Sequence, residues 1–123
     1  MFRTVVLIAF GGAVGSVLRY LTSVIVNKYW NNHFPLSTLI INTVGCFLIG
    51  IITGYCIKNN IQNSSLSWLL ITGFCGGFTT FSAFGLENVT LFQNNHQLIA
   101  FAYIAFSLFI GLFFVWLGLQ TTK

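Results

Sequence analysis

The residues best suited to chemistry are concentrated in one apolar stretch, Gly73–Phe84, which reads GFCGGFTTFSAF. Adjacent glycines and threonines make it a poor continuous helix, because each glycine costs about 1 kcal/mol relative to alanine. An interruption inside a membrane exposes backbone carbonyls, which are tolerated only when they are buried in protein, bind an ion or line water. Such carbonyls suit a small hard cation. The stretch therefore predicts a break near residues 76–80 that is able to hold a cation.

Two further sets of polar residues recur at helical spacing. Thr38, Asn42 and Gly45 are separated by four and three residues, and Tyr103 and Ser107 are separated by four. Each set therefore forms a stripe on one helix face. Polar groups at membrane depth are costly and face either other protein or a water-filled path. Spacing alone leaves two interpretations open for Asn42, a hydrogen bond between helices and the lining of a pore.

The elements that must position these residues are predicted to be membrane-spanning helices. Only 5% of the 123 residues are charged and 56% are hydrophobic, whereas a soluble domain carries about 25% charged residues. With about 20 residues per span, the chain accommodates four helices, at about 2–26, 36–56, 66–92 and 98–119. We therefore expect an all-α integral membrane protein with a single transmembrane domain covering residues 1–123.

The scarcity of reactive side chains argues against an enzyme. Acid–base and nucleophilic mechanisms draw mostly on His, Asp, Glu, Lys and Cys, yet the chain has one acid, Glu87, and two histidines. No run of Lys or Arg indicates a nucleic-acid partner. The three cysteines have no C-x-x-C spacing and are expected to act as small apolar residues.

The distribution of positive charge leaves the orientation in the membrane nearly unspecified. With four spans, Arg3, Lys58 and Lys123 fall on one side, and Lys28 and Arg19 fall on or near the other. Three charges against two is almost no bias under the positive-inside rule. Copies could therefore insert both ways and pair as an antiparallel homodimer, or a cue other than charge could fix one orientation.

At these motifs the sequence resembles the Fluc or CrcB family of small bacterial fluoride channels. The matching pieces are Gly11-Gly12-x-x-Gly15-x-x-x-Arg19-Tyr20, Asn42-x-x-Gly45-x-Phe47-x-x-Gly50 and Gly76-Gly77-Phe78-Thr79-Thr80-Phe81-Ser82-Ala83-Phe84. The resemblance implies a passive fluoride-selective channel that exports cytoplasmic fluoride. It also implies four-helix subunits in a dual-topology antiparallel homodimer, multi-pass in the cell (inner) membrane and surrounded by lipid.

The resemblance further implies roles for individual residues. A structural Na⁺ at the dimer centre would be held by the backbone carbonyls of Gly76 and Thr79 from each subunit. Phe81 and Phe84 would line the fluoride pathway with their ring edges toward the anion, with Asn42 beside them.

Hydroxyl groups are expected to extend this pathway. The resemblance implies that Ser107 and Tyr103 continue the polar track, and the hydroxyls of Thr38 and Ser82 are chemically able to donate to fluoride as well. Arg19 either extends its charge to the membrane interface or provides a positive vestibule that concentrates anions.

Two other functions remain as alternatives. A proton-coupled small-molecule exporter of the dual-topology four-helix type would require a membrane-embedded carboxylate, and Glu87 is the only acid. A non-transporting subunit of a larger membrane complex would fit the same composition. The Gly76–Phe84 string favours the channel over both.

Overall fold

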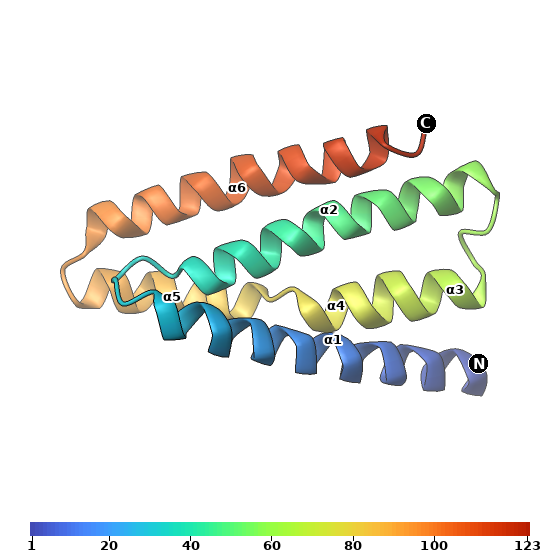
Figure 1. Ribbon diagram of the computed structural model, residues 1–123, viewed down its shortest axis with the longest axis horizontal. Helices are drawn as coiled ribbons and strands as arrows, with labels where there is room; N and C mark the ends of the chain where they lie inside the picture. The colour runs from blue at the N-terminus through green and yellow to red at the C-terminus, as the bar shows by residue number, and fades with distance from the viewer.

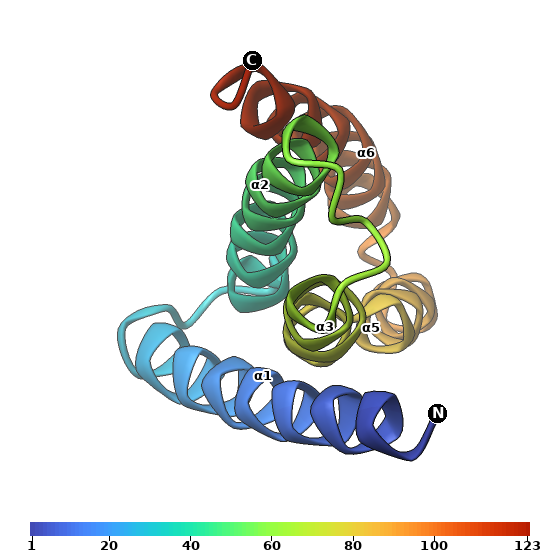
Figure 2. The same cartoon turned by 90° about the vertical axis from the view of Figure 1, so that its right-hand side faces the viewer.

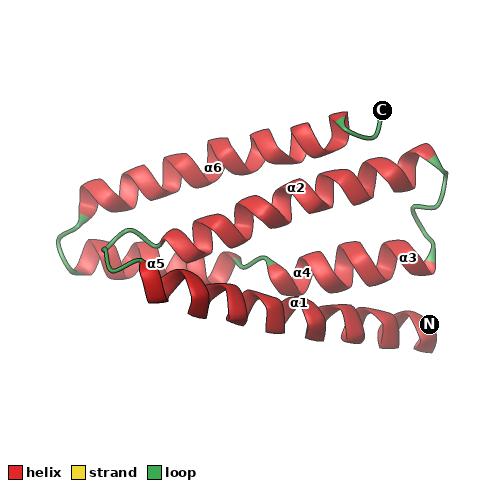
Figure 3. Cartoon of the chain, in the orientation of Figure 1, coloured by secondary structure: helices red, strands yellow, loops and turns green.

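The computed structural model describes residues 1–123 and contains only helices and loops (Figure 3). The elements are α1 (Phe2–Tyr29), α2 (Leu36–Lys58), α3 (Ser65–Ser67), the π-helix η1 (Trp68–Cys75), α4 (Gly76–Phe78), α5 (Phe81–Gln93) and α6 (Gln97–Gln120). Four stretches are long and apolar enough to cross a membrane: Phe2–Tyr29, Leu36–Lys58, Ser65–Gln93 and Gln97–Gln120. The prediction of an all-α protein with four spans is confirmed.

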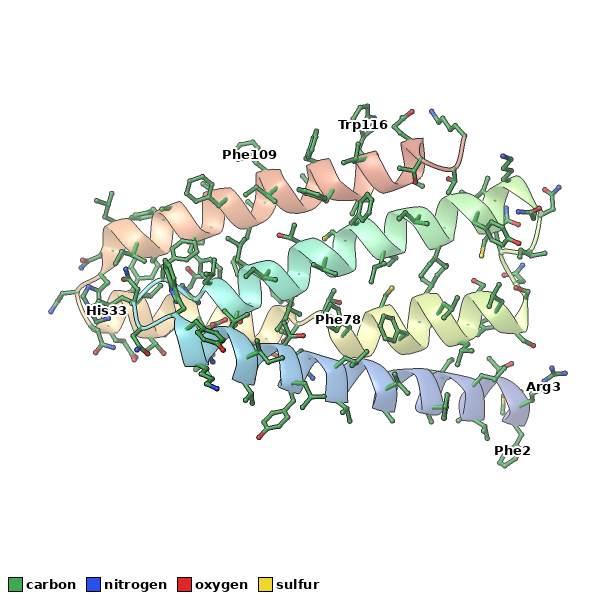
Figure 4. All side chains as sticks on the ribbon, viewed as in Figure 1. Phe2, Arg3, His33, Phe78, Phe109 and Trp116 are labelled. Atoms are coloured by element: carbon green, nitrogen blue, oxygen red, sulfur yellow. The ribbon has the colours of Figure 1, made fainter.

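The four spans run alongside one another, with the chain reversing direction at each loop (Figure 1). Both termini and the loop between α2 and α3 lie at one end, and the other two loops lie at the opposite end (Figure 1). Seen from the end of the bundle, α1 packs against the third span and α6 packs against α2 (Figure 2). Arg3 and His33 mark the two opposite ends (Figure 4).

Glycines allow these two pairs of helices to approach closely. A Cβ atom at Gly11 would collide with the backbone of Leu69 and Phe74, and one at Gly50 would collide with the backbone of α6 near Gly118. Small residues that permit backbone contact are the usual device for helix association in lipid, where no hydrophobic force drives helices together. The large side chains Phe109 and Trp116 instead point outward from α6 (Figure 4).

The largest difference between the predicted and observed helix ends is at the end of α1. The polar residues Asn27, Lys28 and Tyr29 were expected to begin a loop, but α1 continues through Tyr29. No glycine or proline lies between Val26 and Pro35, so nothing in the backbone ends the helix where the apolar run ends. Hydropathy marks the part of a helix that lies in lipid, and a helix can extend beyond it.

The third span is irregular in two ways. Residues Trp68–Cys75 form a π-helix, a rare geometry that often accompanies functional sites. Thr79 (φ −78°, ψ 157°) and Thr80 (φ −147°, ψ 121°) have extended backbones and separate α4 from α5. Both threonines lie near the middle of the Ser65–Gln93 stretch.

Candidate functional site

The extended residues face a hollow that we call the lateral hollow. It has a volume of about 320 Å³ and is bounded by α2, η1, α5 and α6. Its lining contains five of the predicted site residues, which are Asn42, Thr79, Phe81, Phe84 and Ser107. These residues come from three segments that are far apart in the sequence, and the fold brings the segments around one space.

Asn42 and Thr80 are joined by a pair of hydrogen bonds. The Asn42 side-chain nitrogen donates to the Thr80 carbonyl at 3.0 Å, and the Thr80 N–H donates to the Asn42 side-chain oxygen at 2.9 Å. The amide therefore pairs with the extended segment as a neighbouring strand would. One of its two N–H groups is used by this pairing, so one remains to contact a ligand.

The aromatic residues form a row that leaves the lateral hollow toward the loop before α2. The ring centroids of Phe81 and Phe84 are 5.8 Å apart, those of Phe84 and Tyr103 5.0 Å, and those of Tyr103 and Phe34 5.4 Å. The last two contacts are edge-to-face. Phe81 is 82% exposed whereas Tyr103 is completely buried, so the row runs from the surface of the subunit into its interior.

Ser107 has an unusual environment. Its hydroxyl oxygen is buried and has no hydrogen-bond partner. Buried polar groups are nearly always paired, so an unpaired hydroxyl beside a hollow is a candidate for contact with a ligand. Ser107 also lines the lateral hollow, and no existing hydrogen bond holds its hydroxyl in place.

Glu87, one helical turn after Phe84 in α5, accepts hydrogen bonds from two of the predicted residues. Thr38 donates to one carboxylate oxygen at 3.0 Å, and the Tyr103 hydroxyl donates to the other at 3.2 Å. These hydroxyls were predicted to serve the anion directly, and in this structure both are bound to the carboxylate. Sequence reasoning identified Glu87 as the only acid but could not assign it partners, because they lie on helices distant in the sequence.

The remaining predicted residues lie around the extended segment. Ser82 is within 3.4 Å of the Thr80 hydroxyl, which also caps α5 by accepting from the Ala83 N–H. Arg19 donates from Nε to the Gly77 carbonyl at 3.1 Å and is not part of the lining of the lateral hollow. It therefore gives a hydrogen-bond partner to a carbonyl in α4, and a vestibule role for Arg19 stays a prediction.

The backbone carbonyls of Gly76 and Thr79 have the character expected of cation ligands. In a continuous helix the Thr80 N–H would donate to the Gly76 carbonyl, but it donates to Asn42 instead. The Thr79 carbonyl accepts no hydrogen bond. Two free carbonyl oxygens near the middle of a span fit a small hard cation, which takes oxygen ligands.

The three cysteines are all free thiols. Cys46 and Cys75 also line the lateral hollow, a position that sequence patterns did not indicate. Their small size leaves space between α2 and the third span, which agrees with the expectation that they act as small apolar residues.

Comparison with known proteins identifies relatives across the whole chain. The model of the family described as CrcB-like protein, Camphor Resistance (CrcB), matches residues 6–119. The fluoride-specific ion channel FluC of Flavobacterium psychrophilum is 51% identical over 98% of both chains. The proteins of the same name from Azobacteroides pseudotrichonymphae and Methylobacillus flagellatus are 42% and 43% identical, covering 100% and 97% of this chain and 98% and 94% of their own. With its four membrane spans and this near-complete match, the chain is a multi-pass membrane protein that belongs to the CrcB family.

Proposed function

We propose that the protein is a passive, fluoride-selective channel of the cell (inner) membrane that exports cytoplasmic fluoride. The observation that carries this proposal is the 51% identity, over 98% of both chains, to a protein named as a fluoride-specific ion channel. The lateral hollow supports it, because the residues expected to recognise the anion lie together there. The family is one of ion channels and not of enzymes.

Hydrogen-bond donors around the lateral hollow could replace the water molecules that an anion loses when it enters the membrane. Moving a bare ion into a low-dielectric medium nominally costs tens of kcal/mol, so donors must replace its hydration shell. Asn42 retains one free N–H and Ser107 has an unpaired hydroxyl. The edges of Phe81 and Phe84 carry the positive part of the ring quadrupole and contribute on the order of 0.5–1.5 kcal/mol each. Such weak contacts assist passage, since a conducted ion must also leave.

Thr38 and Tyr103 would take part in the same pathway through Glu87. Their hydroxyls are directed to the Glu87 carboxyl group, so they hold this group in place one helical turn beyond Phe84. An anion passing Phe84 would meet hydroxyl groups that can rotate toward it, while Ser82 offers a further hydroxyl beside Thr80.

The channel would be an antiparallel, dual-topology homodimer. Asn42, Thr80 and Ser107 give the lateral hollow polar groups within membrane-spanning helices, and polar backbone is tolerated at that depth only when protein or water covers it. A second copy covering the hollow and the exposed Phe81 ring would meet this requirement. The near-equal charge at the two ends of the bundle supports insertion in both orientations.

A sodium ion at the centre of this dimer is part of the proposal. The carbonyls of Gly76 and Thr79 would hold it, and their freedom from other hydrogen bonds supports the assignment. When bound, such a cation supplies positive charge close to the anion pathway. The chain's own contribution is the extended segment, which Asn42 holds in the conformation that leaves these carbonyls free.

The alternative of a proton-coupled exporter is not favoured. Its mechanism needs a carboxylate that releases and rebinds protons in the substrate path. The only acid is Glu87, and both of its oxygens already accept hydrogen bonds from Thr38 and Tyr103.

Fluoride release from liposomes tests the proposed function directly. Purified protein would be reconstituted in vesicles loaded with potassium fluoride or potassium chloride, and efflux would be started with a potassium ionophore and followed with ion-selective electrodes. We expect rapid fluoride release and negligible chloride release. Equal release of both anions, or no fluoride release from vesicles shown to contain folded protein, would overturn the proposal.

A further inference from the structure

Arg19 is bonded to the backbone of the third span just before the point where its helix is interrupted. The Arg19 Nε donates to the Gly77 carbonyl at 3.1 Å, and the Ser16 hydroxyl donates to the same oxygen at 3.5 Å. Gly12, Ser16 and Arg19 are separated by four and three residues, so they lie on one face of α1. This face therefore presents two hydrogen-bond donors to a single carbonyl oxygen.

A close approach of two backbones makes these bonds possible. α4 lies beside α1 at this point (Figure 1). A Cβ atom at Gly77 would collide with the backbone of Gly12, so a larger residue at position 77 would push the two helices apart. The two glycines thus bring the Gly77 carbonyl within reach of the side chains that follow Gly12 on α1.

The Gly77 carbonyl needs a side-chain partner because the chain beyond α4 is not helical. In a continuous helix this carbonyl would accept the Phe81 N–H. Thr79 and Thr80 have extended backbones, which carry the Phe81 N–H out of reach. An unpaired carbonyl is costly at membrane depth, and charged side chains within spans often pair with backbone carbonyls. The Nε–H of Arg19 therefore replaces the missing backbone donor.

A second side chain holds the extended segment from the opposite direction. Asn42 of α2 bonds to both the N–H and the carbonyl of Thr80, so the segment is fixed between α1 and α2. Thr79, Thr80 and Phe81 line the lateral hollow and begin only two residues after Gly77. A displacement of the Gly77 carbonyl would therefore move this wall of the hollow.

We propose that Arg19 is a positioning residue for the anion pathway, and that it acts through its Nε–H bond to the Gly77 carbonyl and not through its charge. This role rests on the proposed channel function, because its consequence is the shape of the lateral hollow. It differs from the role of a positive vestibule, since a vestibule needs the charge of Arg19. The bond needs only an N–H donor at the position of Nε.

Two neutral substitutions separate the bond from the charge. The amide nitrogen of glutamine lies as many bonds from Cα as the Nε of arginine, so Arg19→Gln can keep the hydrogen bond while it loses the charge. Methionine has a similar length and no donor, so Arg19→Met loses both. Because both variants lose the same charge, a difference between them comes neither from the electric field nor from a changed orientation in the membrane. Arg3→Met is the matched control, an arginine-to-methionine change at an exposed residue.

Amide hydrogen exchange of the purified full-length variants in detergent reports on the segment without involving fluoride. A hydrogen bond in a membrane protein shifts an equilibrium by roughly 3-fold to 18-fold, so exchange at residues 79–83 should accelerate by roughly that factor in Arg19→Met. Exchange in Arg19→Gln and Arg3→Met should match that of the parent. Fluoride efflux from liposomes, measured on the same preparations, should be slower than the parent rate in Arg19→Met only.

Three results would overturn the proposal. Fluoride efflux that is as slow in Arg19→Gln as in Arg19→Met would assign the effect to the charge. Parent-rate exchange in Arg19→Met would show that the bond does not hold the segment, and parent-rate efflux from this variant would remove Arg19 from the pathway. If the parent itself released no fluoride, the channel proposal would fail while the exchange comparison would still test the bond, so the two failures are distinguishable.

Discussion

Replacing Ser107 by alanine separates the proposed anion pathway from the stability of the fold. In most positions a polar-to-alanine change removes a hydrogen bond, so loss of activity and loss of folding occur together. Ser107 is different because its buried hydroxyl has no partner within the subunit. Ser107→Ala therefore breaks no existing hydrogen bond, while it removes a donor from the lateral hollow.

The expected effects have opposite signs. Burying a hydroxyl without a hydrogen bond costs about 1–3 kcal/mol in protein mutational data, so the free energy of unfolding should stay constant or rise by up to that amount. A hydrogen bond to a charged partner contributes about 1.5–3 kcal/mol. If fluoride loses that contact at its highest barrier, flux should fall roughly 10-fold to 150-fold, at 1.36 kcal/mol per factor of ten.

Two measurements on the same preparations would test this. Stability would be measured by SDS-induced unfolding in mixed micelles, and fluoride efflux would be measured from liposomes. Ser64→Ala is the matched control, because the Ser64 side chain accepts the Ser67 N–H at the start of α3 and lies away from the hollow. Losing such a cap costs about 1 kcal/mol, so this variant should be less stable and conduct fluoride normally.

The result that would refute the reasoning is equally specific. Fluoride efflux at the parent rate from folded Ser107→Ala protein would remove Ser107 from the pathway. A marked loss of stability would show instead that the hydroxyl has a structural partner in the assembled protein.

Three further changes probe the pathway and the assembly. Asn42→Leu leaves the Thr80 N–H and carbonyl unpaired. Because a hydrogen bond in a membrane protein contributes about 0.6–1.7 kcal/mol, the free energy of unfolding should fall by about 1–3 kcal/mol. An unchanged free energy of unfolding would contradict the structural role of Asn42. Phe81→Ile and Phe84→Ile remove ring edges worth about 0.5–1.5 kcal/mol, so each should slow fluoride efflux roughly 2-fold to 12-fold, and parent rates in both variants would exclude the rings. Two or three lysines added to the loop at 94–96 should bias insertion toward one orientation and abolish fluoride flux when that variant is expressed alone. If single cysteines in the lysine variant are still labelled from both sides of the membrane, the charge argument is disproved.

The general architecture could be predicted because it depends on local sequence. Apolar runs of the length of a membrane span predict helices regardless of their neighbours, and the four predicted spans lie within a few residues of the observed ones. The extension of α1 to Tyr29 was missed because hydropathy does not report where a helix ends outside the lipid. The π-helix at Trp68–Cys75 has no hydropathy signature of its own.

The predicted site residues differ in how much of their environment could be anticipated. Asn42, Phe81, Phe84 and Ser107 border one hollow, and the family resemblance had grouped them. The pairing of Asn42 with Thr80, however, depends on how far α2 is shifted along its axis relative to the third span. The spacing of side chains within one helix does not determine that shift.

The same reason applies to the polar groups beyond the hollow. The partners of Glu87 come from α2 and α6, and the stacking of His33 on His96 joins two loops that are remote in sequence. Such contacts are properties of the three-dimensional packing.

The response of fluoride to an imposed membrane potential tests the central claim of passive conduction most directly. In reconstituted vesicles held at a membrane potential of about 100 mV, the free energy of a monovalent anion differs by about 2.3 kcal/mol between the two sides. At equilibrium this difference corresponds to a roughly fiftyfold ratio of anion concentrations. We predict that internal and external fluoride approach this ratio, that reversing the potential inverts it, and that a pH difference at constant potential leaves it unchanged. A fluoride distribution that follows the pH difference and ignores the potential would contradict the account.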